Sequence, residues 1–306
     1  MKILIATEKP FASIAIESIM KVVNESGHEL LLLEKYVNKQ QLLDAIAEVD
    51  ALIVRSDKVD ESVIAAATRL KIIVRAGAGY DNIDLAAATA RNIIVMNTPV
   101  LNANAVAELA FGLLLYAVGR QFSGVSGTEL RGKTLGLYAF GAIAQRTAHI
   151  AQGFDMNVIA YSPTGHPEKI KQAGFKATES PEELFKESDI ISLHIPSTPE
   201  TQGCIGRHFL SCMKPNALLI NTARKDIINE PDLETILEER SDLKYYTDLK
   251  PTRHEEFIQK FGIRYFATPK KMGAQTAEAN INAGIAAAKQ ILDYFNTGNT
   301  KFQVNK

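Results

Sequence analysis

Short apolar runs alternate with stretches of helical period along the chain. Runs in which nearly every position is apolar are typical of parallel strands covered on both faces. In the first third of the chain these predicted strands are Lys2–Ala6, Glu29–Leu33, Ala51–Val54, Lys71–Val74 and Asn92–Met96. Between them, the helical spacing of apolar residues predicts helices at Phe11–Val23, Gln40–Ala47, Glu61–Arg69 and Leu85–Arg91.

A second series of the same kind follows Asn97-Thr98-Pro99. It begins with a long apolar helix over Ala103–Arg120 and ends with an Ala-rich helix over Ala277–Phe295. Its predicted strands are Thr134–Phe140, Met156–Tyr161, Ile190–His194, Ala217–Asn221, Tyr245–Asp248 and Arg264–Ala267. Strands that alternate with helices indicate parallel sheets with right-handed crossovers and helices on both faces. The pattern therefore predicts two α/β units joined near Pro99.

Composition narrows the classes of partner. Of 306 residues, 46% are apolar and 23% charged, as in ordinary soluble globular proteins. The 34 Lys and Arg nearly balance the 35 Asp and Glu, so we expect no nucleic acid and no membrane as a partner. The apolar start is broken at Thr7-Glu8-Lys9-Pro10, which argues against a signal peptide. Cys204 and Cys212 lack the spacing of a metal site or a disulfide framework, so we expect a cytoplasmic protein without a metal.

The sharpest local motif lies where a predicted strand runs into a helix. Dinucleotide-binding folds carry G-x-G-x-x-G or A at this turn, and the middle glycine lets backbone N–H groups approach a pyrophosphate. Here the pattern is Ala139-x-Gly141-x-x-Ala144, in which only the middle glycine remains. By itself it fits a dinucleotide site or an ordinary strand–helix turn equally well.

The residue that should bind the ribose is also altered. In this fold a carboxylate commonly ends the next strand and accepts hydrogen bonds from the ribose hydroxyls. This chain has Ser162, which is neutral and does not repel a 2′-phosphate. These residues therefore leave the choice between NAD and NADP open, and NADP is not excluded.

Further motifs make the chain resemble the D-isomer-specific 2-hydroxyacid dehydrogenase family, and within it the short D-3-phosphoglycerate dehydrogenases without a regulatory domain. Six motifs occur in the family's order over nearly the whole chain. They are Ala76-Gly77-Ala78-Gly79-Tyr80-Asp81-Asn82-Ile83-Asp84; Asn97-Thr98-Pro99 with Asn102 and Val106-Ala107-Glu108-Leu109; Leu130-Arg131-Gly132-Lys133-Thr134-Leu135-Gly136; Ser192-Leu193-His194-Ile195-Pro196 with Thr201; Asn221-Thr222-Ala223-Arg224; and Ala267-Thr268-Pro269 running into Gly273.

The resemblance implies two Rossmann-like, doubly wound parallel-sheet domains with the cofactor in an inter-domain cleft. Residues 1–98 plus 276–306 would form the substrate-binding domain, and residues 99–275 the dinucleotide-binding domain. It also implies a homodimer, and the strongly apolar helix after Asn102 is compatible with burial at a subunit interface or between the domains. No ligand-sensing domain is expected in addition.

For the substrate, the resemblance assigns the carboxylate and carbonyl to Arg224, whose planar guanidinium fits both. It also assigns the carboxylate to the backbone N–H groups of Ala78 and Gly79, and places Asn102 near the reacting centre. Asn102 is equally a candidate helix N-cap. Arg55, beside Ser56, aligns with an arginine that binds the substrate phosphate, although a solvated strand end is an equal reading.

For the cofactor, the resemblance implies residues at the ends of several strands. His194 belongs to a His-x-Pro segment that lines the cofactor and is not expected to be the acid–base group. The cofactor-binding candidates are Ala139, Gly141, Ala142, Ile143, Ser162, His194, Pro196, Thr201, Thr222, Asp248 and Gly273.

The family's usual acid–base pair is missing. The family has a His directly after Thr-Pro and a Glu about twenty residues earlier, which orients the His and raises its proton affinity. This chain has Lys270 and then Lys271 after Pro269, and Arg253 at the position of the Glu. We expect Lys271 or Lys270 to move the proton, with Lys271 slightly favoured. The alternative is two solvated loop lysines.

These features predict an NAD-dependent oxidoreductase that converts 3-phosphoglycerate into 3-phosphohydroxypyruvate for serine biosynthesis. The partner is then a small phosphorylated 2-hydroxy acid. A hydroxypyruvate or glyoxylate reductase of the same family is the nearest alternative. A dinucleotide-sensing module without catalytic activity is a third hypothesis, motivated by the altered glycine motif and the missing His–Glu pair.

Overall fold

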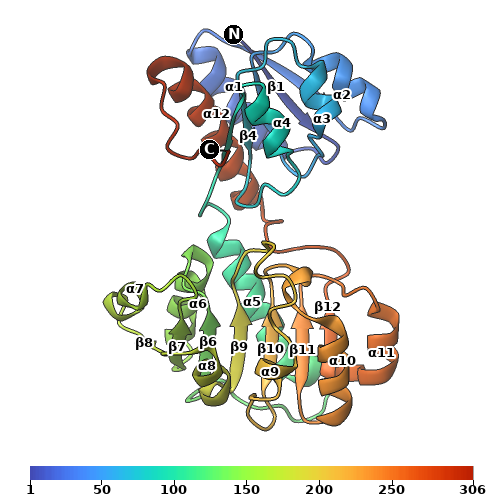
Figure 1. The fold of residues 1–306 in the computed structure, drawn as a ribbon, viewed down its shortest axis with the longest axis vertical. Helices are drawn as coiled ribbons and strands as arrows, with labels where there is room; N and C mark the ends of the chain where they lie inside the picture. The colour runs from blue at the N-terminus through green and yellow to red at the C-terminus, as the bar shows by residue number, and fades with distance from the viewer. Residues whose placement is uncertain (306) are drawn as a thin grey trace. The chain divides into compact units, whose positions relative to one another are not determined.

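The computed structural model describes residues 1–305, and these divide into two compact units. One unit contains Met1–Asn102 together with the segment from Gln275 onward, and the other contains Ala103–Ala274. Each is a parallel β-sheet with helices on both faces (Figure 1). The α/β class with two Rossmann-like, doubly wound sheets is therefore confirmed.

The first unit has five strands in the order β2-β1-β3-β4-β5, all parallel. This is a doubly wound order whose winding reverses between β1 and β3. The strands are β1 (Lys2–Thr7), β2 (Glu29–Glu34), β3 (Ala51–Val54), β4 (Ile72–Arg75) and β5 (Ile94–Asn97). The helices are α1 (Ser13–Glu25) and α12 (Ala277–Thr297) on one face, and α2 (Lys39–Ile46), α3 (Glu61–Ala66) and α4 (Leu85–Ala90) on the other.

The second unit has seven parallel strands in the order β12-β11-β10-β9-β6-β7-β8, with the reversal between β6 and β9. This is the dinucleotide-binding order with one strand added at the β11 edge. The strands are β6 (Thr134–Tyr138), β7 (Asn157–Tyr161), β8 (Lys176–Ala177), β9 (Ile190–Leu193), β10 (Leu218–Asn221), β11 (Lys244–Thr247) and β12 (Tyr265–Ala267).

Helices from both halves of the second unit cover its sheet. Helices α5 and α6 pack on one face, and α8 to α11 pack on the other (Figure 1). The helices are α5 (Ala103–Val118), α6 (Ala142–Gln152), α7 (Pro167–Gln172), α8 (Pro181–Glu187), α9 (Arg207–Leu210), α10 (Glu230–Glu239) and α11 (His254–Phe261).

Side-chain caps explain where half of these helices begin. The capping residue accepts a hydrogen bond from an N–H of the first turn, which would otherwise lack a partner. The capping residues are Asn38, Asp60, Asp84, Ser180, Asn229 and Thr276. Helix α6 is among those without a side-chain cap, and its N-cap is Gly141.

The predicted strands all occur, and the structure adds β8, which is not among them. One predicted strand and one predicted helix differ in detail. The run Glu29–Leu33, which the pattern predicts to be buried on both faces, forms the edge strand β2, where Leu32 is 42% exposed. Helix α3 ends at Ala66 and not at Arg69, because Ala67 takes an extended backbone. Within residues 1–305, no helix is long and apolar enough to cross a membrane.

Candidate active site

The turn between β6 and α6 presents an uncapped helix N-terminus. Gly141 is the N-cap, and a Cβ built on it meets nothing within 4 Å, so a ligand can approach the backbone here. Ala142 and Ile143 follow in the first turn, whose N–H groups point out of the helix. Such N–H groups together with the helix dipole favour an anion such as a pyrophosphate. Ala144, at the third position of the motif, is fully buried against the sheet.

At the first position of the motif, Ala139 adopts a backbone conformation that glycine usually occupies. Ala139 has a φ of 77°, in the left-handed region that disfavours a side chain. Its N–H donates to Tyr161 O (2.9 Å), which joins the turn to the end of β7. The chain therefore retains the turn of a dinucleotide fold at a cost in backbone strain.

The variant Ala139→Gly should stabilise the protein. Left-handed backbone costs an L-residue about 1–2 kcal/mol, and the extra freedom of glycine in the unfolded chain offsets about 0.5–1 kcal/mol of the gain. We expect a higher midpoint in urea unfolding, equivalent to roughly 0.5–1 kcal/mol. The control Ala148→Gly, inside α6, should lower the midpoint. A destabilised Ala139→Gly variant would contradict this account of the turn.

His194 follows β9, at the point where the winding of the sheet reverses. Its backbone N–H donates to Tyr138 O (3.0 Å), and its Nε2 atom is buried with no hydrogen-bond partner among the described residues. Burial lowers the pKa of His194 to about 3. The imidazole is thus neutral at ordinary pH and has a low affinity for a proton, in line with the expectation that it is not the acid–base group, and Nε2 is available to a polar ligand.

The turn after β10 orients the arginine expected to bind the substrate. Asn221 Nδ2 donates to Arg224 O (2.9 Å), and Asn221 Oδ1 accepts from Ala223 N (3.0 Å). Arg224 is half-buried, and its Nη1 donates to Ala223 O (2.9 Å). Within this turn the hydroxyl of Thr222 is buried and has no partner in the described structure. Asn221 is therefore a positioning residue for Arg224.

Asp248 anchors the loop that carries the two lysines. Its Oδ1 accepts from Thr268 Oγ1 (2.7 Å) and Met272 N (2.7 Å), and its Oδ2 accepts from Gly273 N (2.8 Å). The carboxylate is buried, and these donors occupy three of its roughly four acceptor positions. Asp248 thus fixes the path of residues 268–273. Its predicted contact with the cofactor stays a prediction.

The variant Asp248→Asn should loosen this loop. An amide offers one acceptor oxygen in place of two, and its NH2 group would face a backbone N–H. We expect a loss of about 1–3 kcal/mol in the free energy of unfolding, the cost of a buried donor without a partner. Urea unfolding measures it, and Asp226→Asn, at an exposed carboxylate, is the control. Equal stability of the two variants would contradict the anchoring role.

Lys270 and Lys271 are both exposed on this loop. Arg253 occupies the position where the family has a Glu. It forms ion pairs with Glu234 on α10 and Glu256 on α11. Proton transfer by Lys271 or Lys270 stays a prediction.

Two further cofactor candidates of this unit, Ser162 and Thr201, form hydrogen bonds within their own loops. Ser162 Oγ accepts from His166 N (3.2 Å) after β7. Thr201 Oγ1 donates to the carbonyl of the exposed Pro196 (2.7 Å) and accepts from Thr198 N (2.8 Å). These bonds shape the segments that the resemblance assigns to the cofactor.

In the first unit, the glycine-rich loop after β4 leaves backbone donors free. Gly77 has a φ of 149°, and a Cβ there would collide with the guanidinium of Arg75. Asn97 Nδ2 donates to Ala78 O (2.6 Å) and Thr98 N donates to Gly77 O (3.0 Å), which ties down the carbonyls of the loop. Within residues 1–305, no backbone hydrogen bond uses the N–H of Ala78 or Gly79. This loop fits a carboxylate.

Arg55 lies at the end of β3 and is half-buried. Its Nη1 donates to Lys9 O (3.1 Å) and Pro10 O (3.2 Å), and burial lowers the pKa of its guanidinium. The neighbouring Ser56 is exposed. The loop after β5 contains Asn102, whose Oδ1 is buried without a partner among the residues described.

The two units therefore each collect their candidates at the carboxyl edge of the sheet, where open α/β sheets bind ligands. The second unit fits a dinucleotide, because an open helix N-terminus lies at its switch point and the buried polar atoms His194 Nε2 and Thr222 Oγ1 have no partner in the part of the chain that the structure describes. No group of three or more His, Cys, Asp or Glu side chains in the described chain could hold a metal ion.

Comparison with known proteins agrees with these features. Residues 112–260 match the family model of the D-isomer specific 2-hydroxyacid dehydrogenase, NAD binding domain. A hydroxypyruvate reductase of Thermotoga maritima is 38% identical over 284 residues, which are 86% of this chain and 90% of that protein. A D-3-phosphoglycerate dehydrogenase of Methanocaldococcus jannaschii is 36% identical over 90% of this chain and 55% of its own length. The chain thus spans about half the length of such relatives.

Among solved structures, the NAD+-bound 3-phosphoglycerate dehydrogenase of Entamoeba histolytica is 46% identical, with a TM-score of 0.93. The similarity covers 100% of this chain and 99% of that one.

Proposed function

The chain belongs to the D-isomer-specific 2-hydroxyacid dehydrogenase family, and from this premise we propose that it is an NAD-linked oxidoreductase acting on a D-2-hydroxy acid. We propose 3-phosphoglycerate as the substrate and 3-phosphohydroxypyruvate as the product, on the path to serine. Residues 99–275 would bind the dinucleotide, and residues 1–98 plus 276–306 the substrate.

One observation carries the proposal: an open helix N-terminus lies at the switch point of the seven-stranded sheet, and two buried polar atoms at the ends of β9 and β10 have no partner among the described residues. Gly141, Ala142 and Ile143 would hold the pyrophosphate through backbone N–H groups. His194 and Thr222 would offer hydrogen bonds to the rest of the dinucleotide. When bound, NAD supplies the site that accepts or returns the hydride.

The chain's own residues then bind the acid and move its proton. Arg224 binds the carboxylate and polarises the carbonyl, since its guanidinium donates in two parallel directions. Ala78 and Gly79 offer backbone N–H groups to a carboxylate, and Asn102 lies near the reacting centre. Lys271, or Lys270, gives the proton to the substrate oxygen in reduction and takes it back in oxidation.

Arg55 is the residue that would make the site select a phosphorylated substrate. It is a cation held in place by neutral acceptors, so its charge remains available to a phosphate. Ser56, exposed beside it, can add a hydroxyl donor. A hydroxypyruvate or glyoxylate reductase would need no such cation.

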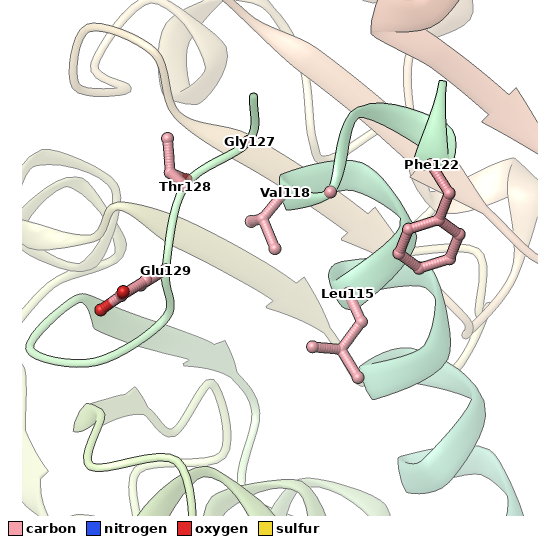
Figure 2. A pocket seen from close by; sticks show the side chains of 7 residues that line it. Leu115, Val118, Phe122, Gly127, Thr128 and Glu129 are labelled. Atoms are coloured by element: carbon pink, nitrogen blue, oxygen red, sulfur yellow. The ribbon is translucent and has the colours of Figure 1, made fainter. Parts of the chain in front are cut away.

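We propose a homodimer on a smaller observation. Most apolar side chains of α5 lie in the core of their own unit, but Leu115 remains partly exposed beside Phe122, which is 72% exposed. Figure 2 shows these side chains around the last turns of α5, next to the segment 127–129. The oligomeric state in solution, measured by light scattering, tests this.

The function is tested by following NADH consumption with 3-phosphohydroxypyruvate, hydroxypyruvate and glyoxylate, with NADPH in parallel. We expect a strong preference for the phosphorylated acid and for NADH. Turnover of the unphosphorylated acids alone would assign the chain to the reductases of the family. Dinucleotide binding without turnover of any acid would favour the sensing module.

A further inference from the structure

At the carboxyl ends of β1 and β3 lies the guanidinium of Arg55, whose hydrogen-bond acceptors within residues 1–305 are all neutral. Besides the carbonyls of Lys9 and Pro10, Arg55 donates through Nη2 to Asn280 Oδ1, and it lies 5.0 Å from the centroid of the Phe11 ring. Three of its five N–H groups are therefore used inside the unit, and two remain. Within residues 1–305 no carboxylate forms an ion pair with this guanidinium.

The nearby carboxylate of Asp57 is committed elsewhere. Its Oδ1 accepts from Glu8 N (2.6 Å) and from Tyr36 Oη (2.9 Å), and its Oδ2 accepts from the backbone N–H of Arg55 (3.4 Å). Asp57 therefore fixes the backbone of the loops after β1 and β3. It forms no hydrogen bond with the Arg55 guanidinium, although its negative charge partly offsets the lowering of the guanidinium pKa by burial.

The orientation of Asn280 is set by its own helix. Its Nδ2 donates to Thr276 O (2.8 Å), so its Oδ1 must be the atom that faces Arg55. An aspartate here would have the same shape and would accept the same bond, but it would neutralise the guanidinium. The amide holds the arginine and leaves its charge intact.

We propose that Asn280 is a positioning residue for substrate specificity: it holds Arg55 for the phosphate of the substrate without cancelling its charge. This inference rests on the proposed function, because it names the group that makes the site select a phosphorylated acid. Asn280 touches Arg55 and need not touch the substrate.

The test compares kcat/KM for 3-phosphohydroxypyruvate and for hydroxypyruvate in Asn280→Asp, Asn280→Ala and the wild type. For Asn280→Asp we expect the ratio of the two values to fall by about 10- to 100-fold, mainly through KM for the phosphorylated acid, as for a lost charge-assisted bond. Asn280→Ala should give a smaller fall. The control is Asn282→Asp, which makes the same change at an exposed position of the same helix and should keep the ratio.

A second readout separates this inference from the proposed function. Binding of inorganic phosphate, measured by calorimetry, should weaken in Asn280→Asp and stay unchanged in Asn282→Asp. If the wild type shows no preference for the phosphorylated acid, the proposed substrate is wrong, and phosphate binding alone then decides on Asn280. If both Asn280 variants keep the ratio and the phosphate affinity, or lose activity equally on both acids, the positioning role is overturned.

Discussion

Replacing Arg224 by Gln should lower kcat/KM by about 10²- to 10³-fold, the effect of removing a donor aimed at developing charge. Arg224 lies in the turn after β10, which Asn221 holds in place by two hydrogen bonds. Ligands bind at this end of the strands in open α/β sheets. Steady-state kinetics with 3-phosphohydroxypyruvate measures the loss. NADH affinity should not change, because we assign this side chain to the substrate and not to the dinucleotide.

Two further variants make the result specific. Arg224→Lys keeps the charge but loses the planar pair of donors, so it should lie between Gln and wild type. Arg131→Gln removes an exposed arginine of the same unit and should leave kcat/KM unchanged. If Arg224→Gln kept wild-type kcat/KM, the substrate would not be bound as proposed.

The second large effect is expected from the lysine loop. Changing Lys270 and Lys271 together to Met should lower kcat by about 10²- to 10⁴-fold, the usual contribution of a positioned acid or base. Of the single variants, Lys271→Met should lose more. Lys171→Met, at an exposed lysine on α7, is the control.

The pH profile identifies the proton carrier. Oxidation needs the neutral amine, so its rate should rise with pH, whereas reduction needs the ammonium and should slow as pH rises. Because burial lowers the pKa of His194 to about 3, that imidazole stays neutral across this range and cannot produce the slope. An arginine at the active lysine position keeps the charge but cannot release a proton, and it should abolish the alkaline rise. Two Met variants with wild-type kcat would end the lysine hypothesis.

Much of the fold follows from the apolar pattern. Buried parallel strands are apolar at nearly every position, so runs such as Ile72–Val74 and Ile190–Leu193 stand out from the helices between them. The short helices of the second unit cannot be recognised from the apolar pattern. Helix α7 buries only Ile170, and β8 has two residues, too few for any periodicity to show.

The site residues likewise fall into those that the sequence predicts and those that it does not. Residues within local motifs, such as Gly141 and Arg224, could be selected from the sequence because a turn or a strand end places them. Residues that act through distant partners could not. Asn280 meets Arg55 across 225 positions of the chain, and Asp248 reaches Gly273 across 25. Only the folded sheet brings these pairs together.

Above all, we propose that the chain oxidises a D-2-hydroxy acid with NAD+. The most direct measurement follows NADH formation at alkaline pH from D-3-phosphoglycerate and, separately, from its L enantiomer. We predict NADH with the D enantiomer and none with the L enantiomer. No NADH from either, or turnover of the L enantiomer, would contradict the account.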